Sequence, residues 1–192
     1  MYFKPKNGVN DQFHMVLMVC KETYFPLIVL FLCSFKCEIM SKNLFEITLQ
    51  NRRNLHAILT KTPKEKLLKI PEGFNNNIFW NIAHTIVTQQ ILQYKFSGLQ
   101  MRVPDELVAK FMKGTTPDGT ATDEEIMMVA DFLISTIEWL KEDYDTDLFQ
   151  NYIEYTTSAR VTLKNIDDAI AFNLFHEGLH IGAIILLLRK VG

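Results

Sequence analysis

Histidine is the residue type whose spacing in this chain best predicts chemistry. The chain has five histidines, and two of them, His176 and His180, are four residues apart near the C-terminus. In a helix, two such imidazoles lie one turn apart on one face, the spacing that a single metal ion needs for two ligands. Three imidazoles with a fourth position left for water or substrate are typical of catalytic rather than structural metal sites. The chemistry of such a site therefore depends on a third ligand from elsewhere in the chain.

The same segment also matches a metalloprotease motif. The string HEGLH at residues 176–180 has the form HExxH, in which two His hold zinc and the Glu is the general base. Such enzymes take their third ligand from further along the chain, but no His, Asp, Glu or Cys follows His180. The longer form of the motif also fails, because its Gly and its third His are not in place. A zinc protease is disfavoured, and the third ligand is expected upstream.

His84 is the best upstream donor, because it lies in the middle of an apolar helical pattern. Together with His176 and His180 it forms the predicted ligand set for a divalent ion. Zinc or nickel is expected, although imidazole also suits copper and iron. The alternative for His84 is a histidine at the edge of the core that hydrogen-bonds to a backbone group or to Asn81. The alternative for His176 and His180 is a pair of partly exposed helix residues that binds no metal.

Other polar residues are weaker candidates. Asn173 lies one turn before His176 and is placed to orient that ring by a hydrogen bond. Glu177 is rotated about 100° from His176, so it faces either the edge of the site or solvent, and it is the candidate base if the ion activates water. His56 is expected at the surface, and His14 is given no role.

Four long helical patterns are expected to position these residues, at residues 41–61, 76–98, 123–143 and 166–190. Polar capping residues mark the first three starts, at Ser41, at the Asn run 75–77 and at Thr122. The last helix is apolar on nearly all sides in its second half, so it is predicted to be the most buried.

The connections at residues 62–75, 99–122 and 144–165 are long enough to cross over the helices. The second of them is predicted to hold a short helix that begins at Pro104 and stops by Gly114. Residues 152–163 are rich in β-formers and could form a short extended segment. The predicted fold class is nevertheless all-α.

Composition describes one ordinary soluble domain. The chain has 192 residues, of which 48% are hydrophobic and 22% charged, and a net charge of −2. These values exclude fibrous and disordered classes. The slightly acidic balance and the absence of any Lys/Arg-rich run argue against nucleic-acid binding, so a small-molecule substrate is the expected partner.

The first forty residues differ from the rest, because they hold all three cysteines (Cys20, Cys33 and Cys37). Their apolar stretch, residues 24–35, is too short for a membrane-spanning helix, which needs roughly 20 residues, and no signal-peptide cleavage site follows it. We therefore expect residues 1–40 to be an extension outside the fold, residues 41–192 to be the domain, and the protein to be cytoplasmic without stable membrane insertion. Membrane association through residues 24–35 is the alternative.

Two segments resemble the DinB/YfiT-like superfamily of metalloenzymes. They are FWNIAHTIVTQQ in the second predicted helix and NIDDAIAFNLFHEGLHIGAIILLLRKVG at the C-terminus. The resemblance covers residues 41–192 and rests on one His in the second helix and a His-x3-His pair, followed by Gly, in the last. It implies a four-helix bundle of up-down-down-up order, with long crossover connections, a metal held by His84, His176 and His180, and commonly a homodimer.

The resemblance also implies a type of reaction, because the better-understood members are similar to thiol-dependent transferases and isomerases. Residues 41–192 contain no cysteine, so a low-molecular-weight thiol would come from solution. We therefore expect a metal-dependent transferase that acts through a metal-bound thiol or water. The alternatives are a metal-dependent hydrolase with Glu177 as base, and a non-enzymatic helical module that binds a metal or a small ligand.

Overall fold

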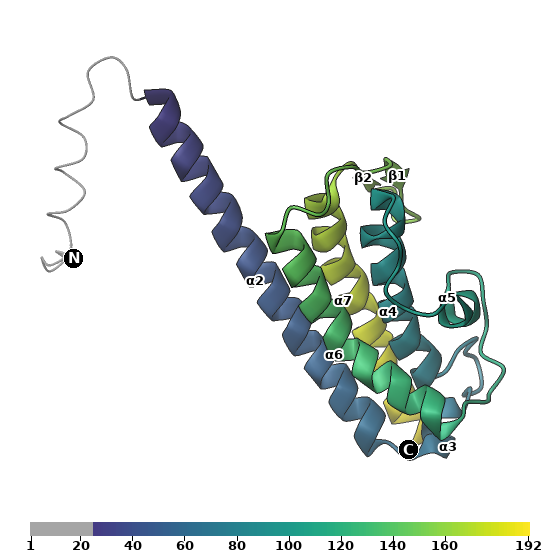
Figure 1. Ribbon diagram of the computed structural model, residues 1–192. Coiled ribbons are helices and arrows are strands. Elements are labelled where there is room, and N and C mark those ends of the chain that lie inside the picture. Colours follow the sequence, from purple (N-terminus) through teal and green to yellow (C-terminus); the bar gives the residue numbers. More distant parts are fainter. Residues whose placement is uncertain (1–24) are drawn as a thin grey trace, which may run out of the picture. The chain divides into compact units, whose positions relative to one another are not determined.

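The computed structural model describes the backbone of residues 25–192 and the side chains of residues 43–192. Its elements are, in order, α2 (Phe25–Lys61), α3 (Lys64–Leu68), α4 (Ile78–Gln93), the 3-10 helix η1 (Lys95–Ser97), α5 (Asp105–Phe111), α6 (Asp123–Asp145), β1 (Tyr155–Thr156), β2 (Thr162–Leu163) and α7 (Ile166–Val191) (Figure 1). The all-α prediction is confirmed. The up-down-down-up order of a four-helix bundle stays a prediction.

The chain divides into two compact units, Met1–Ser41 and Lys42–Gly192. His14, Cys20 and the side chains of residues 24–40, which include the other two cysteines, lie outside the described residues. The predictions that concern residues 1–40 therefore stay predictions. The second unit contains all the histidines of the predicted site.

One helix start differs from the expectation. The first helix was expected to begin at Ser41, but it begins at Phe25, so Ser41 is not its N-cap. The physical reason is that no Pro or Gly occurs between Pro26 and Pro63, so nothing in the backbone stops the helix from propagating through Ser41.

The other predicted starts coincide with caps. Asn77 Oδ1 accepts a hydrogen bond of 2.8 Å from the Trp80 amide at the start of α4. Thr122 Oγ1 accepts one of 3.1 Å from the Glu125 amide at the start of α6. In the long connection between them, Pro104 is the N-cap of α5 rather than its first residue. Each cap satisfies a backbone donor that the helix leaves unpaired.

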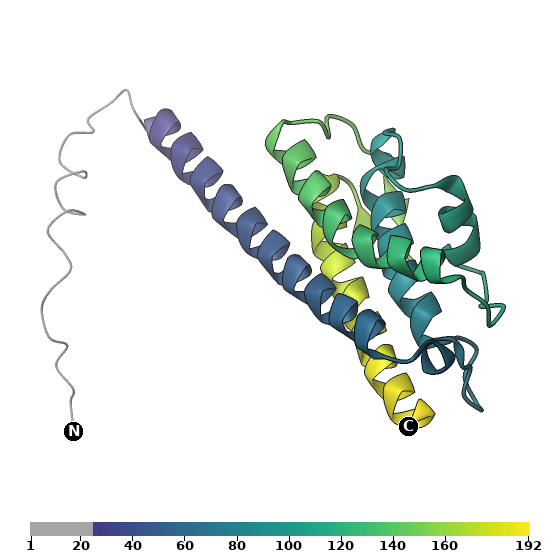
Figure 2. The ribbon, with the colours of Figure 1, turned by 60° about the horizontal axis from the view of Figure 1, so that its bottom comes forward.

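The four long helices and α5 share one hydrophobic core, and α4 lies at its centre. Every residue of α4 is buried except Thr88 and Ile91. Helix α4 lies between α7 and α5, as Figures 1 and 2 show from two directions. The large apolar residues that α4, α6 and α7 contribute include Ile82, Leu133 and Leu187, all fully buried.

The last helix is less buried than predicted. In α7 the side chains of Phe175 and Leu179 are 52% and 57% exposed, and Ile185 and Leu186 are also exposed. The prediction that this helix is the most buried is therefore wrong. Neighbours surround α4, whereas no element in the described part of the chain covers the outer face of α7.

Among the described residues, α7 is also the one helix long and apolar enough to cross a membrane by length and composition alone. Core helices of folded domains meet the same criterion. The inner face of α7 carries buried polar residues, Asn173 and Glu177, which pair with other groups of the domain. The helix is therefore weak evidence for a membrane location.

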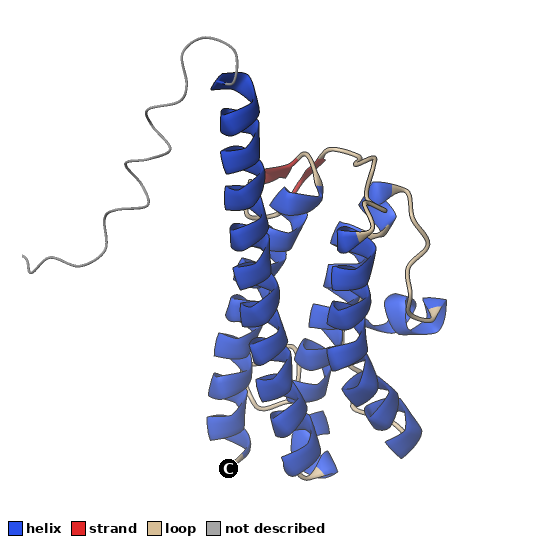
Figure 3. Ribbon diagram, turned by 60° about the vertical axis from the view of Figure 1, so that its left-hand side comes forward, coloured by secondary structure: helices blue, strands red, loops and turns tan. Residues whose placement is uncertain are grey.

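A small β-hairpin closes one end of the fold (red in Figure 3). Tyr155 pairs with Leu163 and Thr156 with Thr162, in antiparallel register. The segment before it is fixed to the end of α4, because the Ile153 amide donates to the Phe96 carbonyl and the Tyr152 hydroxyl donates to the Leu92 carbonyl at 2.9 Å. The β-rich pattern at residues 152–163 thus corresponds to a short extended segment.

Candidate metal centre

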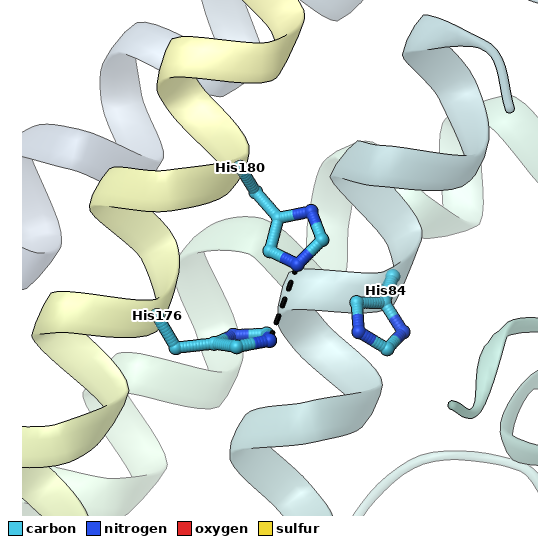
Figure 4. A group of neighbouring side chains, drawn as sticks. All are labelled: His84, His176 and His180. Carbon is cyan, nitrogen blue, oxygen red and sulfur yellow. Dashed lines mark hydrogen bonds between the residues drawn. The ribbon is translucent and has the colours of Figure 1, made fainter. Parts of the chain in front are cut away.

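The structure brings together the three histidines that the sequence singled out. His84 comes from α4, and His176 and His180 come from consecutive turns of α7 (Figure 4). One potential ligand atom from each residue lies within 4.8 Å of the other two. The Nε2 atoms of His176 and His180 are 3.2 Å apart. His56, half-buried on α2, lies outside this group.

The hydrogen bond of His84 fixes which of its nitrogens can bind a metal. Nδ1 lies 2.6 Å from the backbone carbonyl of Phe111, the last residue of α5. A carbonyl only accepts, so Nδ1 carries the proton and Nε2 keeps its lone pair. Nε2 is 3.2 Å from the Thr88 hydroxyl. The predicted alternative, a histidine bonded to a backbone group, is thus present together with the cluster rather than instead of it.

Asn81 orients His180 in the same manner. The Asn81 amide nitrogen donates to the Asn77 carbonyl at 2.7 Å and to Asn76 Oδ1 at 3.0 Å. The Asn77 carbonyl can only accept, so the bond to it determines the orientation of the Asn81 amide. In that orientation Asn81 Oδ1 faces His180 Nδ1, 2.8 Å away. His180 Nδ1 therefore carries a proton, and its Nε2 lone pair faces the cluster.

Asn173 was expected to orient His176, but its amide nitrogen donates instead to Glu177 Oε1 at 2.8 Å. Its Oδ1 is buried and has no hydrogen-bond partner among the described residues, and the same is true of His176 Nδ1. Asn173 Oδ1 is an acceptor, and His176 Nδ1 is a donor when Nε2 of the same ring keeps its lone pair. The two residues belong to adjacent turns of α7. The orienting role of Asn173 stays a prediction.

Burial keeps the three imidazoles neutral. It lowers the pKa of His176 to about 3, with further contributions from the charges of His180, His84 and Arg52. It also lowers the pKa of His180 to about 4, with the charge of His84 adding to the effect. The pKa of His84 is lowered by burial too, although its bond to the Phe111 carbonyl opposes the shift. All three rings are therefore in the form that binds metal at neutral pH.

Glu177 is neither at the edge of the site nor in solvent, which corrects the expectation. It is fully buried and paired with Arg52 of α2. Its Oε1 accepts from Arg52 Nε at 2.9 Å and from Arg52 Nη2 at 2.7 Å, besides the bond from Asn173. Arg52 also donates to the Thr85 carbonyl of α4. A carboxylate committed to a guanidinium in this way is poorly placed to accept a proton at the histidines.

Two of these groups were not predicted from the sequence, the Arg52 side chain and the Phe111 carbonyl. Arg52 was given no role, yet it falls on the stripe of α2 that also contains Phe45, Leu55 and Leu59, all buried. That helical spacing was a signal for a core position. The Phe111 carbonyl had no such signal, because backbone atoms leave no trace in residue types.

A pocket of about 120 Å³ opens beside the histidines. His84, Thr88 and His176 form part of its lining. The walls come from α4, η1, the hairpin and α7, and Lys113 lies at the rim. Trp80 stacks on the other face of the cluster, with its ring 4.5 Å from that of His84 and an interplanar angle of 11°.

The spacing of the His176 and His180 nitrogens suits a single divalent ion, and His84 lies within 4.8 Å of both. Metal–nitrogen bonds of about 2.0–2.1 Å in tetrahedral geometry separate two ligand nitrogens by roughly 3.3 Å. The 3.2 Å between the Nε2 atoms of His176 and His180 agrees with this value. Two of the three rings have Nδ1–H groups that point to fixed acceptors, as metal-bound histidines usually do. The cluster could therefore hold a metal ion.

Comparison with a protein-family model covers the part of the chain that holds this cluster. The model of the DinB superfamily matches residues 47–184, well over half of the chain and a range that contains all three histidines. No curated protein matches the chain significantly. The matched range, the helical fold and the histidine cluster together confirm the resemblance first seen in the two sequence segments. The chain belongs to the DinB superfamily.

Proposed function

We propose that this protein is a metal-dependent enzyme whose divalent ion is held by His84, His176 and His180. The observation that carries the proposal is the arrangement of three neutral, buried imidazoles from two helices around one point. Zinc or nickel is the proposed ion. Such an ion, when bound, supplies a Lewis acid that lowers the pKa of a water or thiol ligand.

The proposed reaction is transfer to or from a small-molecule substrate, with a low-molecular-weight thiol or water as the second reactant. The pocket beside His84 and His176 gives such a substrate access to the cluster. Residues 41–192 contain no cysteine, so the thiol would come from solution. The role of the protein groups is to orient the rings: the Phe111 carbonyl holds His84, and Asn81 holds His180.

The alternatives receive less support. A hydrolase with Glu177 as base is disfavoured by the contacts of Glu177 with Arg52 and Asn173. A non-enzymatic module that binds metal or a small ligand shares the same cluster and differs only in lacking turnover. We further propose the up-down-down-up bundle order, a homodimer and a cytoplasmic location, with residues 1–40 as an extension. The shared core of the four long helices supports the first of these.

Metal analysis of the full chain, purified without a His tag, tests the proposal. After incubation with Zn²⁺ or Ni²⁺ and gel filtration, about one ion per chain is expected for the parent protein. The variant His176→Ala with His180→Ala is expected to retain less than about 0.2, because two of three ligands are lost. His56→Ala, outside the cluster, should match the parent. A parent protein that retains less than about 0.2 ion per chain would falsify the proposal.

The Co²⁺ form distinguishes a thiol-dependent enzyme from one that uses water. Addition of glutathione or 2-mercaptoethanol is expected to produce the charge-transfer absorption of sulfur bound to cobalt. No such band with either thiol, in a protein that holds one Co²⁺ per chain, would count against the thiol and leave water as the reactant.

Asn81→Leu is expected to weaken metal binding by about tenfold to a hundredfold, because His180 loses the acceptor that orients its ring. Asn81→Asp keeps an acceptor oxygen and should retain most of the affinity. Asn76→Ala removes a different bond of the same amide and serves as the matched control. The measurement is a competition titration with a chromophoric chelator, beside thermal unfolding to confirm that each variant folds. Equal affinity in the Leu and Asp variants would show that Asn81 has no orienting role.

A further inference from the structure

We propose that the pocket beside the histidines binds a small carboxylate carried on a compact apolar body, and that Lys113 recognises its charge. This inference rests on the proposed function, since it names the class of substrate that would reach the cluster.

The pocket limits the size of its occupant. Its volume of about 120 Å³ is somewhat smaller than the roughly 150 Å³ cavity known to hold benzene. A single small ring or a short branched chain therefore fills it. A larger molecule could place only one end inside.

The walls that face this body are apolar and firmly held. Ile91, Phe96 and Phe172 belong to the lining. Phe96 stacks on Tyr155 of the hairpin, with ring centroids 4.4 Å apart and an interplanar angle of 20°. The hydrogen bond from Ile153 to the Phe96 carbonyl fixes the same wall through the backbone. A preformed apolar wall favours a rigid apolar ligand, because neither the wall nor the ligand loses much conformational entropy on binding.

The charge of the pocket is one-sided. No Asp or Glu belongs to its lining in the described part of the chain, and the cationic side chain in it is Lys113. Lys113 has no carboxylate within ion-pair distance among the described residues, whereas Lys110 in the same region pairs with Glu125 at 2.9 Å. Lys113 is exposed, so its ammonium can move toward a ligand at the rim.

Two further features agree with an anion in the pocket. The Ser158 hydroxyl is exposed in the turn of the hairpin and belongs to the lining, so it is available as a donor. His84 and His176 belong to the same lining, and the proposed divalent ion there would add positive charge. The field along the pocket therefore favours a negatively charged ligand over a neutral one of equal shape.

A carboxylate suits this site better than a phosphate ester. One ammonium and one hydroxyl match a single negative charge, whereas phosphate sites usually combine several donors with backbone amides. The proposed ligand class is therefore a small organic acid with a compact apolar body.

The experiment compares benzoate, benzamide and phenyl phosphate as probes of the full chain, by isothermal titration calorimetry, with and without bound Zn²⁺. Benzoate is expected to bind more tightly than benzamide, which has nearly the same shape and no charge. Lys113→Ala should weaken benzoate by about fivefold to tenfold and leave benzamide unchanged. Lys113→Arg should restore the preference. Lys141→Ala, which removes an equal charge from α6 outside the pocket, is the control.

Equal binding of benzoate and benzamide, or benzoate binding that Lys113→Ala does not change, would overturn the inference. Phenyl phosphate binding more tightly than benzoate would overturn the choice of a carboxylate. The result is separable from the proposed function. Benzoate binding that depends on Lys113, in a protein that holds no metal, would support the carboxylate pocket and contradict the proposed metalloenzyme. One bound ion per chain, with no preference for benzoate over benzamide, would support the metalloenzyme and contradict the carboxylate pocket.

Discussion

Arg52→Met is expected to lower the free energy of unfolding by about 3–5 kcal/mol, because it leaves the Glu177 carboxylate buried and without its cation. Both side chains are completely buried. Arg52 also joins three helices, since it lies on α2, pairs with Glu177 of α7 and donates to the Thr85 carbonyl of α4. Its loss therefore removes a charge pair and a contact between helices at once.

The double variant Arg52→Met with Glu177→Leu separates these effects. With neither charge present, most of the lost stability should return, because the cost lies mainly in the unpaired ion rather than in the absence of the pair. Lys64→Met is the control, since its ion pair with Asp123 has side chains 43% and 77% exposed and is worth about 0–1 kcal/mol. Urea unfolding at pH 7.5 measures all four proteins. A cost for Arg52→Met no larger than that for Lys64→Met would contradict the prediction.

Acid is expected to destabilise the metal-free protein well before its carboxylates are protonated. The pKa of His180 is lowered to about 4 and that of His176 to about 3, whereas the same rings titrate near 6.5 in the unfolded chain. Between these values the unfolded state binds more protons, so stability is complete above pH 6.5 and falls as the pH decreases. Each ring contributes up to about 1.4 kcal/mol per pH unit, and a loss of about 2–4 kcal/mol is expected between pH 7 and pH 5.

Urea unfolding of chelator-treated protein at several pH values between 7.5 and 5 provides the measurement. The variant His176→Gln with His180→Gln lacks two of the three rings whose pKa is lowered, so its stability should change less over the same range. His56→Gln should follow the parent. Parallel curves for the parent and the double variant would show that the two rings do not control the acid response.

The clustering of the three histidines and the helices that carry them could be predicted from the sequence. The spacing of His176 and His180 needs only helical geometry, and Asn77 and Thr122 act through side-chain caps that depend on local sequence. Such features can be predicted from the sequence because they involve residues within one or two turns of each other. The family resemblance extended this reading to the whole domain.

Other features depend on contacts between distant segments. The burial of Glu177 follows from Arg52, which is 125 residues away. The exposure of Phe175 and Leu179 follows from the absence of a described neighbour beside that face of α7, which apolar composition alone does not reveal. The two charged residues were nevertheless detectable. Each lies on the buried stripe of its own helix, and a positive and a negative charge on two such stripes favour each other as partners.

The bond from His84 to the Phe111 carbonyl joins the histidine cluster to the segment that carries Lys113. Phe111 ends α5, and Lys113 follows two residues later in the same connection. A ligand that draws this segment toward the pocket also moves the acceptor that sets the tilt of the His84 ring. Thermodynamic reciprocity requires the converse, so an ion that fixes the ring also fixes the position of the rim. Substrate and metal would then bind cooperatively, through one short stretch of backbone.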